Sequence, residues 1–136
     1  MIHQVRVIFG DTDKMGVVYY ANYLRWFEAA RAALLRAHGL SGRDLDDLGV
    51  GFPVAEAHCR YRRPALYEDV VDIDIQVAEL GGARVRFEYV LRRGDDLVAE
   101  GYTVHACVDG AGRPCRIPAR IRGAFSQPVE ASPGSI

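Results

Sequence analysis

The chain of 136 residues has almost no net charge, no long apolar run and a single lysine, Lys14. Seventeen basic residues are set against 18 acidic ones, so the formal net charge is -1, whereas a nucleic-acid-binding domain normally carries a clear basic excess. No apolar run approaches the roughly 18 residues that a membrane helix needs, and the N-terminus shows no apolar core of a signal peptide. We therefore expect one cytoplasmic domain that binds no nucleic acid and does not span a membrane.

Cysteine is scarce as well. The three cysteines, Cys59, Cys107 and Cys115, are odd in number and form no CxxC pair, and the four histidines are scattered along the chain. This pattern excludes a disulfide framework and argues against a zinc site, so we expect no bound metal. Cys59 and Cys107 lie among apolar neighbours in predicted strands, which is typical of buried thiols rather than nucleophiles.

Several catalytic signatures are also missing. There is no GxSxG elbow, which excludes a serine hydrolase of the α/β type. There is no GxGxxG motif and no P-loop, so nucleotide-dependent redox and phosphoryl-transfer chemistry have no support. The chemistry has to be sought elsewhere in the chain.

One long helix is predicted over Asn22–Ala37, which contains no Gly or Pro, with Asn22 as a plausible N-cap and Gly39 as the stop signal. Its polar residues, Arg25, Glu28 and Arg31, are spaced three apart, so Glu28 can pair with both arginines. The rest of the circumference is largely apolar, which is typical of a helix that other elements enclose. The apolar stripe consists of Tyr23, Trp26, Phe27, Ala30, Leu34 and Ala37.

Most of the remaining chain alternates between apolar and polar residues, the period of half-buried strands. Gly81 and Gly82 form a hairpin signal between two of these strands. We expect an α+β domain over residues 1–125, in which an antiparallel sheet of about five strands wraps around one central helix, followed by a flexible tail at 126–136. The predicted strands are Gln4–Phe9, Phe52–Arg63, Asp69–Leu80, Ala83–Arg93 and Leu97–Asp109.

The polar loop before the helix carries residues that a core does not need. Asp11 and Asp13 lie just ahead of a helix start, where unpaired N–H groups and a partial positive charge are available, and Gly16 permits a backbone conformation that other residues avoid. Backbone donors beside a carboxylate are what acyl transfer requires. An Asp at this place is more often a helix cap or a turn residue, and spacing alone leaves both interpretations open.

The stretch Phe9–Arg31 resembles the signature of the hot-dog-fold acyl-CoA thioesterases, in the branch of 4-hydroxybenzoyl-CoA thioesterase and the Tol-Pal-associated, YbgC-like enzymes. The likeness continues through Tyr61–Pro64, Asp69, the double-glycine turn and Glu100-Gly101, and covers about nine-tenths of the chain. The matching residues of the motif are Asp11, Asp13, Gly16, Val17, Val18, Tyr19, Asn22, Tyr23 and Glu28.

The resemblance implies a thioesterase in which Asp13 is the catalytic carboxylate, either attacking the thioester carbonyl or activating a water molecule. The backbone N–H of Tyr20 would polarise the carbonyl, and Gly16 would shape the turn. Glu28 matches an acidic position that faces the acyl ring, although pairing with its arginine neighbours explains it equally well. Asn22 and Tyr23 carry over as further substrate-binding positions.

Tyr20 departs from the Tol-Pal-associated branch, which generally has a catalytic histidine at this place. A tyrosine phenol, with an ordinary pKa of about 10, is no base near neutral pH. A mechanism based on Asp13 and backbone donors is therefore favoured. The acyl group is left open between aromatic and short or medium aliphatic types.

Two arginine runs suit the phosphates of coenzyme A, which is part of the substrate rather than a separate cofactor. One run includes Arg63 and the other spans residues 113–122, although charges on alternate strand positions often only face solvent. The family closes its site between subunits, so we expect a homodimer or a dimer of dimers, which would also protect exposed sheet edges.

Two rival functions remain. A hydratase or dehydratase acting on an acyl thioester needs a histidine near the helix start, and none occurs between His3 and His38. A binding module that holds acyl-CoA or an acyl-carrier protein without turnover is the second rival, and binding without thiol release would support it.

Overall fold

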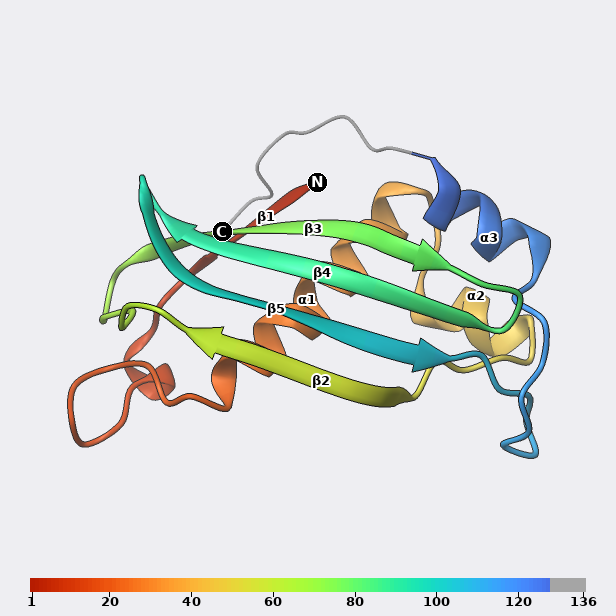
Figure 1. Cartoon of the computed structure of the whole chain (residues 1–136), viewed down its shortest axis with the longest axis horizontal. Coiled ribbons are helices and arrows are strands. Elements are labelled where there is room, and N and C mark those ends of the chain that lie inside the picture. The colour runs from red at the N-terminus through yellow and green to blue at the C-terminus, as the bar shows by residue number, and fades with distance from the viewer. Residues whose placement is uncertain (128–136) are drawn as a thin grey trace.

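The structure is a computed structural model and describes residues 1–127. Five antiparallel strands form one sheet in the order β1-β3-β4-β5-β2 (Figure 1). The strands are β1 (Ile2–Arg6), β2 (Val54–Tyr61), β3 (Val70–Leu80), β4 (Arg84–Arg93) and β5 (Asp96–Ala106). The helices are α1 (Asn22–Ala37), α2 (Gly42–Asp47) and α3 (Ala119–Ser126), and a short 3-10 turn, η1 (Phe9–Asp11), follows β1. The α+β architecture agrees with the prediction.

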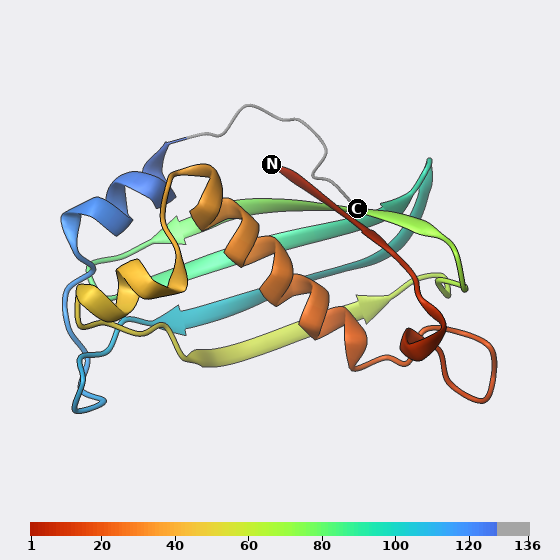
Figure 2. The ribbon, with the colours of Figure 1, turned by 180° about the vertical axis from the view of Figure 1, so that it is seen from behind.

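Helix α1 runs diagonally across one face of the sheet, while α2 and α3 lie together at the far end of that face (Figure 2). The predicted bounds of α1 are confirmed, and Gly39 ends the helix with a φ of +76°. The predicted N-cap is wrong: Ala21 occupies the cap position and contributes no side-chain bond, while Asn22 is the first helical residue. No helix among residues 1–127 is long and apolar enough to cross a membrane.

The core forms between the apolar stripe of α1 and the inward-facing residues of β3, β4 and β5. Phe27 of α1 stacks on Tyr89 of β4, with ring centroids 4.0 Å apart and planes 3° from parallel. Gly101 of β5 makes this approach possible, because a Cβ there would lie 3.0 Å from the Phe27 ring and 2.1 Å from the His58 carbonyl oxygen. Five of the six predicted stripe residues are buried, and the exposed Ala37 is the exception.

The first strand is shorter than predicted. β1 ends at Arg6, and Phe9, expected on the buried side of a strand, is 77% exposed. The chain turns here because the Asp11 carboxylate accepts a hydrogen bond from the Ile8 N–H at 3.0 Å and stabilises η1.

The C-terminal part also differs from the prediction. Helix α3 was not predicted, and its last residue, Ser126, lies where the flexible tail was expected to begin. Phe125 anchors α3 through edge-to-face contacts with Phe52 and Phe87, at 5.7 and 5.4 Å between ring centroids. The remainder of the predicted tail, residues 128–136, lies outside the described residues.

Candidate active site

Asp13 lies in a tight turn that projects from the N-terminal side of α1. The Asp13 N–H donates to the Val17 carbonyl oxygen and the Gly16 N–H to the Asp13 carbonyl oxygen, both at 2.9 Å. Gly16 has a φ of +81°, as expected for a residue that shapes this turn. These hydrogen bonds fix the backbone of Asp13 in the loop and do not involve its side chain.

The two loop carboxylates have different surroundings. Asp11 is only 4% exposed, forms an ion pair with Arg25 at 2.6 Å and accepts the Ile8 N–H. Asp13 is partly exposed, and its Oδ1 accepts the Met15 N–H at 2.8 Å, while its Oδ2 has no partner among residues 1–127. Asp11 thus supports the loop, and Asp13 is the carboxylate with a free oxygen.

Backbone donors are available where the loop joins α1. The Asn22 N–H donates to the Tyr19 carbonyl oxygen and the Tyr23 N–H to the Tyr20 carbonyl oxygen, whereas the Tyr20 N–H has no acceptor within residues 1–127. Unpaired N–H groups at a helix start carry partial positive charge. The Tyr20 N–H is therefore a candidate donor to a carbonyl oxygen or an oxyanion.

Tyrosine side chains surround this junction. The Tyr61 hydroxyl donates to the Tyr20 carbonyl oxygen at 3.1 Å, which ties the end of β2 to the start of α1. Partial burial, together with the neighbouring Cys59, raises the pKa of Tyr61 to about 12, so its hydroxyl keeps the proton that makes this bond. The pKa of Tyr19 is raised by the Tyr20 hydroxyl beside it and, to a smaller degree, by the negative charge of Asp13.

Two residues carried over as substrate-binding positions have other contacts. The Asn22 side chain donates to the Asp11 carbonyl oxygen at 2.8 Å and so holds the loop against the helix. Tyr23 is 3% exposed, and its hydroxyl accepts the Ala65 N–H at 3.3 Å. The ring of Tyr23 therefore belongs to the core, and its role in substrate binding stays a prediction.

Comparison with known proteins identifies the family. A profile of the thioesterase-like superfamily matches residues 7–125. The chain belongs to this superfamily. It is 34% identical over 123 residues to the acyl-CoA thioesterase YbgC of Haemophilus influenzae, which covers 89% of this chain and 90% of that protein.

Two further relatives of the thioesterase act on named aromatic substrates. This chain is 37% identical over 111 residues to the 1,4-dihydroxy-2-naphthoyl-CoA hydrolase of Synechococcus elongatus, with 79% of this chain and 82% of that protein covered. The structure of a gentisyl-coenzyme A thioesterase superposes with a TM-score of 0.83 at 32% identity, covering 93% of this chain and all of that one. The predicted hot-dog fold is confirmed.

Glu28 of the thioesterase lies on α1, well away from Asp13. Its side chain is exposed and forms no ion pair within residues 1–127, so the predicted pairing with Arg25 and Arg31 is wrong. Arg25 binds Asp11 instead, and Arg31 donates to the Tyr89 hydroxyl. Glu28 borders a cavity of about 220 Å³ beside α1, lined mainly by Arg31, Leu35, Phe52, Phe87, His105 and Phe125.

A chain of hydrogen bonds lies beneath this cavity. Arg31 donates to the Tyr89 hydroxyl at 3.1 Å, and the Tyr89 and Thr103 hydroxyls are 2.6 Å apart. His105 follows, with Nε2 at 2.8 Å from the Thr103 hydroxyl and Nδ1 at 2.9 Å from the Phe52 carbonyl oxygen. Because that carbonyl can only accept, Nδ1 carries a proton. In the neutral ring, Nε2 can then accept a hydrogen bond from the Thr103 hydroxyl. Burial lowers the pKa of His105.

Arg63 follows the last residue of β2 by two positions, and this end of β2 lies on the same side of the fold as the loop that precedes α1 (Figure 1). Arg63 pairs with Asp96 at 3.3 Å, and both side chains are largely exposed. The second arginine run lies at the opposite end, where Arg120 pairs with Asp44 at 3.8 Å and Arg122 donates to the Gly81 carbonyl oxygen at 2.7 Å. Only the first run is near the loop.

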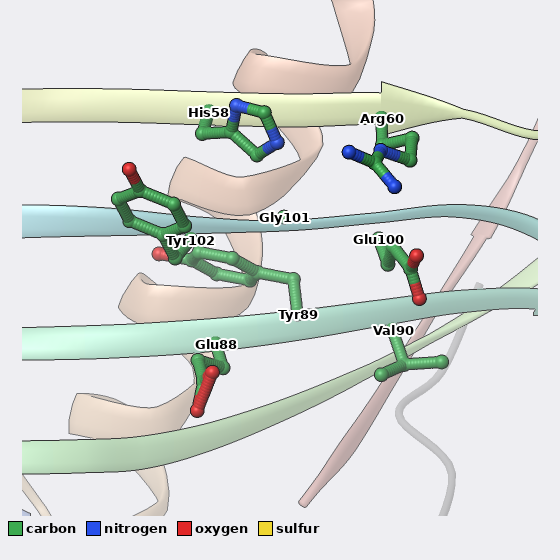
Figure 3. A pocket seen from close by; sticks show the side chains of 8 residues that line it. All are labelled: His58, Arg60, Glu88, Tyr89, Val90, Glu100, Gly101 and Tyr102. Carbon is green, nitrogen blue, oxygen red and sulfur yellow. The ribbon is translucent and has the colours of Figure 1, made fainter.

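A shallow hollow of about 260 Å³ lies on the outer face of the sheet, with α1 on the far side of the strands (Figure 3). Two of its polar groups have partners: Glu100 pairs with Arg62, and the Tyr102 hydroxyl donates to Glu56 at 3.1 Å. His58 stacks on Tyr102. No three His, Cys, Asp or Glu side chains within residues 1–127 gather closely enough to hold a metal ion. The Asp13 loop is the candidate active site on which the proposed function rests.

Proposed function

We propose that the thioesterase hydrolyses an acyl-CoA with Asp13 as its catalytic carboxylate and the Tyr20 N–H as the donor to the thioester oxygen. The observation that carries this assignment is the contrast between the two loop carboxylates, since Asp11 is buried in an ion pair and Asp13 has a free oxygen. Family membership supplies the reaction class, thioester hydrolysis.

In the reaction, water and the acyl-CoA yield the free acid and the thiol of coenzyme A. As a general base, Asp13 takes a proton from the water whose oxygen adds to the carbonyl carbon. The Tyr20 N–H then stabilises the oxyanion, which collapses and expels the thiolate. As a nucleophile, Asp13 forms an acyl anhydride that water hydrolyses in a second step. Both routes use the same two groups.

Glu28 is the residue proposed to meet the acyl group. A helix rises about 1.5 Å per residue, so the six residues from Asn22, the first residue of α1, to Glu28 correspond to about 9 Å along the axis. At that distance Glu28 is too far to touch the thioester carbonyl of the same site. It can meet only the far end of the acyl group or a substrate held by a second subunit. The substrates for which two relatives are named, a dihydroxynaphthoyl and a gentisyl thioester, favour an aromatic acyl group over an aliphatic one.

Arg63 is proposed to bind the phosphates of coenzyme A. Its ion pair with Asp96 joins two exposed side chains, and such pairs contribute little to stability. A phosphate can therefore displace the carboxylate at low cost. Arg60 adds an exposed guanidinium on β2 with no carboxylate partner within residues 1–127. A cytoplasmic location, where coenzyme A is abundant, stays a prediction.

A homodimer, or a dimer of two such dimers, is the proposed assembly. β2 is an edge strand, and all but one of its residues are exposed. Tyr20, whose ring contacts that of Tyr61 at the end of β2, is 62% exposed. Phe9 and Tyr67, which contact each other, are 77% and 54% exposed. An open edge next to an apolar patch needs a cover. Sedimentation equilibrium giving a monomer at micromolar concentration would contradict this assembly.

The test is thiol release from a panel of aromatic and aliphatic acyl-CoAs by the wild type and by Asp13→Asn. We expect the variant to lose about 10²-fold or more in kcat, because the amide neither accepts a proton nor attacks the carbonyl. Asp47→Asn, an exposed carboxylate at the other end of the fold, is the matched control and should keep full activity.

Two outcomes would contradict the assignment. Near-normal turnover by a folded Asp13→Asn protein would remove Asp13 from the mechanism. Binding of acyl-CoA by the wild type without thiol release across the whole panel would instead favour the binding module.

A further inference from the structure

Two of the three free cysteines lie side by side at the α3 end of the molecule. Cys107 directly follows β5 and is buried, and Cys115 lies half-buried in the segment that leads to α3. Their Sγ atoms are 3.6 Å apart. We propose that Cys107 and Cys115 form a site of reversible oxidation, at which a small disulfide such as oxidised glutathione closes an intrachain disulfide.

The backbone places the two residues directly opposite each other. Val108 and Pro114 form an antiparallel bridge, and the Cys115 N–H donates to the Cys107 carbonyl oxygen at 2.9 Å. Residues paired in this way have Cα atoms about 5.5 Å apart. That spacing lies within the range of roughly 4.4–6.8 Å that disulfides span.

The turn between the cysteines keeps this register. The Asp109 carboxylate accepts the N–H groups of Ala111 and Arg113 at 2.9 and 3.0 Å, and Gly112 takes a φ of +78°. The Asp109 N–H also donates to the Arg113 carbonyl oxygen at 2.9 Å. With the backbone held, only side-chain rotation is needed to bring the sulfurs from 3.6 Å to the bond length of about 2.05 Å.

The oxidation proceeds by two thiol–disulfide exchanges. The Cys115 thiolate attacks one sulfur of the small disulfide, forming a mixed disulfide and releasing one thiol. Cys107 then loses its proton to solvent and attacks the Cys115 sulfur, releasing the second thiol. The protein dithiol loses two electrons and two protons, and the small disulfide is reduced to two thiols.

Accessibility decides the order of attack. Burial raises the pKa of Cys107 to about 12, so as an independent thiol it is unreactive at neutral pH. Cys115 is the thiol that an oxidant can reach. Arg113 and Arg116 beside it are exposed and have no carboxylate partner within residues 1–127, so an anionic disulfide is attracted to this site.

The disulfide would reinforce one wall of the cavity that Glu28 borders. The segment after Cys115 already binds the β3–β4 turn, through the Ile117 N–H and the Gly82 carbonyl oxygen at 2.9 Å. It leads to α3, whose Phe125 lines the cavity. A covalent link to the end of β5 restricts the unfolded chain, so the oxidised protein should be more stable than the reduced one.

Tryptic mapping tests the site directly. Trypsin cleaves after Arg93 and Arg116 but not after Arg113, because proline follows, so residues 94–116 form one peptide with both cysteines. After treatment with oxidised glutathione and alkylation under denaturing conditions, we expect this peptide unalkylated and two hydrogens lighter. Cys59, on another peptide, should be alkylated. Titratable thiols should fall from three to one.

Variants separate the pair from the third cysteine. Cys115→Ser should leave Cys107 alkylatable, and Cys59→Ser should behave like the wild type. Oxidation should raise the wild-type Tm by about 5–10 °C and leave that of Cys115→Ser unchanged. Any of three results would overturn the proposal. Both thiols of peptide 94–116 could stay alkylatable, or the main product could be a stable glutathione adduct on Cys115 or a dimer linked through Cys59.

Discussion

Large side chains are buried at the centre of the helix–sheet interface and exposed in the Asp13 loop. At the centre, Phe27 and Tyr89 are stacked and almost fully buried, and Gly101 has no room for a single added carbon. In the loop, Phe9 is 77% exposed and Met15 85% exposed. The centre is complete within one chain, whereas the loop presents apolar surface that another molecule can cover.

The two aspartates of the loop repeat this contrast within three residues. Asp11 behaves like a core residue, with its charge neutralised by Arg25 and its second oxygen bound to a backbone N–H. Asp13 keeps one oxygen free. Under the proposed function, Asp11 contributes to stability and Asp13 to catalysis, and substitutions can separate the two roles.

The largest effect is expected at the centre. Gly101→Ala would place a Cβ 2.1 Å from the His58 carbonyl oxygen, so β2 or α1 would have to shift. We expect a loss of about 3 kcal/mol in the free energy of unfolding, or no soluble protein. Gly110→Ala is the matched control, because nothing lies within 4 Å of its added carbon. Chemical denaturation measures the free energy of unfolding of both variants. Equal stability of the two would contradict the close packing at Gly101.

An intermediate effect is expected for Asp11→Asn. The substitution removes the charge that Arg25 pairs with and weakens the bond to the Ile8 N–H, while Arg25 itself is mostly exposed. We expect a loss of about 1–2 kcal/mol in the free energy of unfolding. Asp13→Asn, the same chemical change two residues on, should leave the stability unaltered. Urea titrations that found the reverse order would break the distinction between the two carboxylates.

The smallest effect is a pH dependence from His105. Burial lowers the folded-state pKa of His105 below the ordinary value of 6.5, because the charged ring loses its hydration, and the nearby positive charge of Arg31 lowers it further. The unfolded chain binds the proton more readily, so the contribution is complete above about pH 6.5 and is lost as the pH falls through the folded-state pKa.

The measurement is the free energy of unfolding between pH 7 and 5 for the wild type and His105→Gln. The wild type should lose more stability on acidification than the variant does. Burial also lowers the pKa of His3, so a residual slope should persist in the variant. Identical slopes would show that His105 does not contribute.

Local patterns predicted the regular elements well. The bounds of α1 follow from a run without Gly or Pro that ends before Gly39, and β3 to β5 follow from alternation separated by glycine turns. Where the prediction was wrong, a side-chain contact that the alternation pattern does not contain changed the outcome, three residues away at Asp11 and far along the chain at Phe125. Phe9 lies outside the strand because the Asp11 carboxylate accepts a hydrogen bond from the Ile8 N–H. Ser126, of the predicted tail, is the last residue of α3, where Phe125 packs against the sheet.

The candidate site divides in the same way. The positive φ of Gly16 is a local property of the loop, and the sequence indicates it. The roles of the arginines are not local, because Glu28 is the nearest acid to Arg25 along the helix, whereas its actual partner is Asp11, 14 residues away. Likewise, nothing in the spacing of the tyrosines indicates that the Tyr61 hydroxyl would bind the Tyr20 carbonyl oxygen.

The sequence by itself determined the fold class, the single long helix and the loop in which a carboxylate precedes a helix start. Those features depend on periodicity, turn residues and capping, which act over a few neighbouring residues. Only the tertiary structure decided which carboxylate is free, which thiols are adjacent and which edge of the sheet is open. These depend on which distant segments pack together, since burial and pairing are properties of the folded chain rather than of any stretch within it.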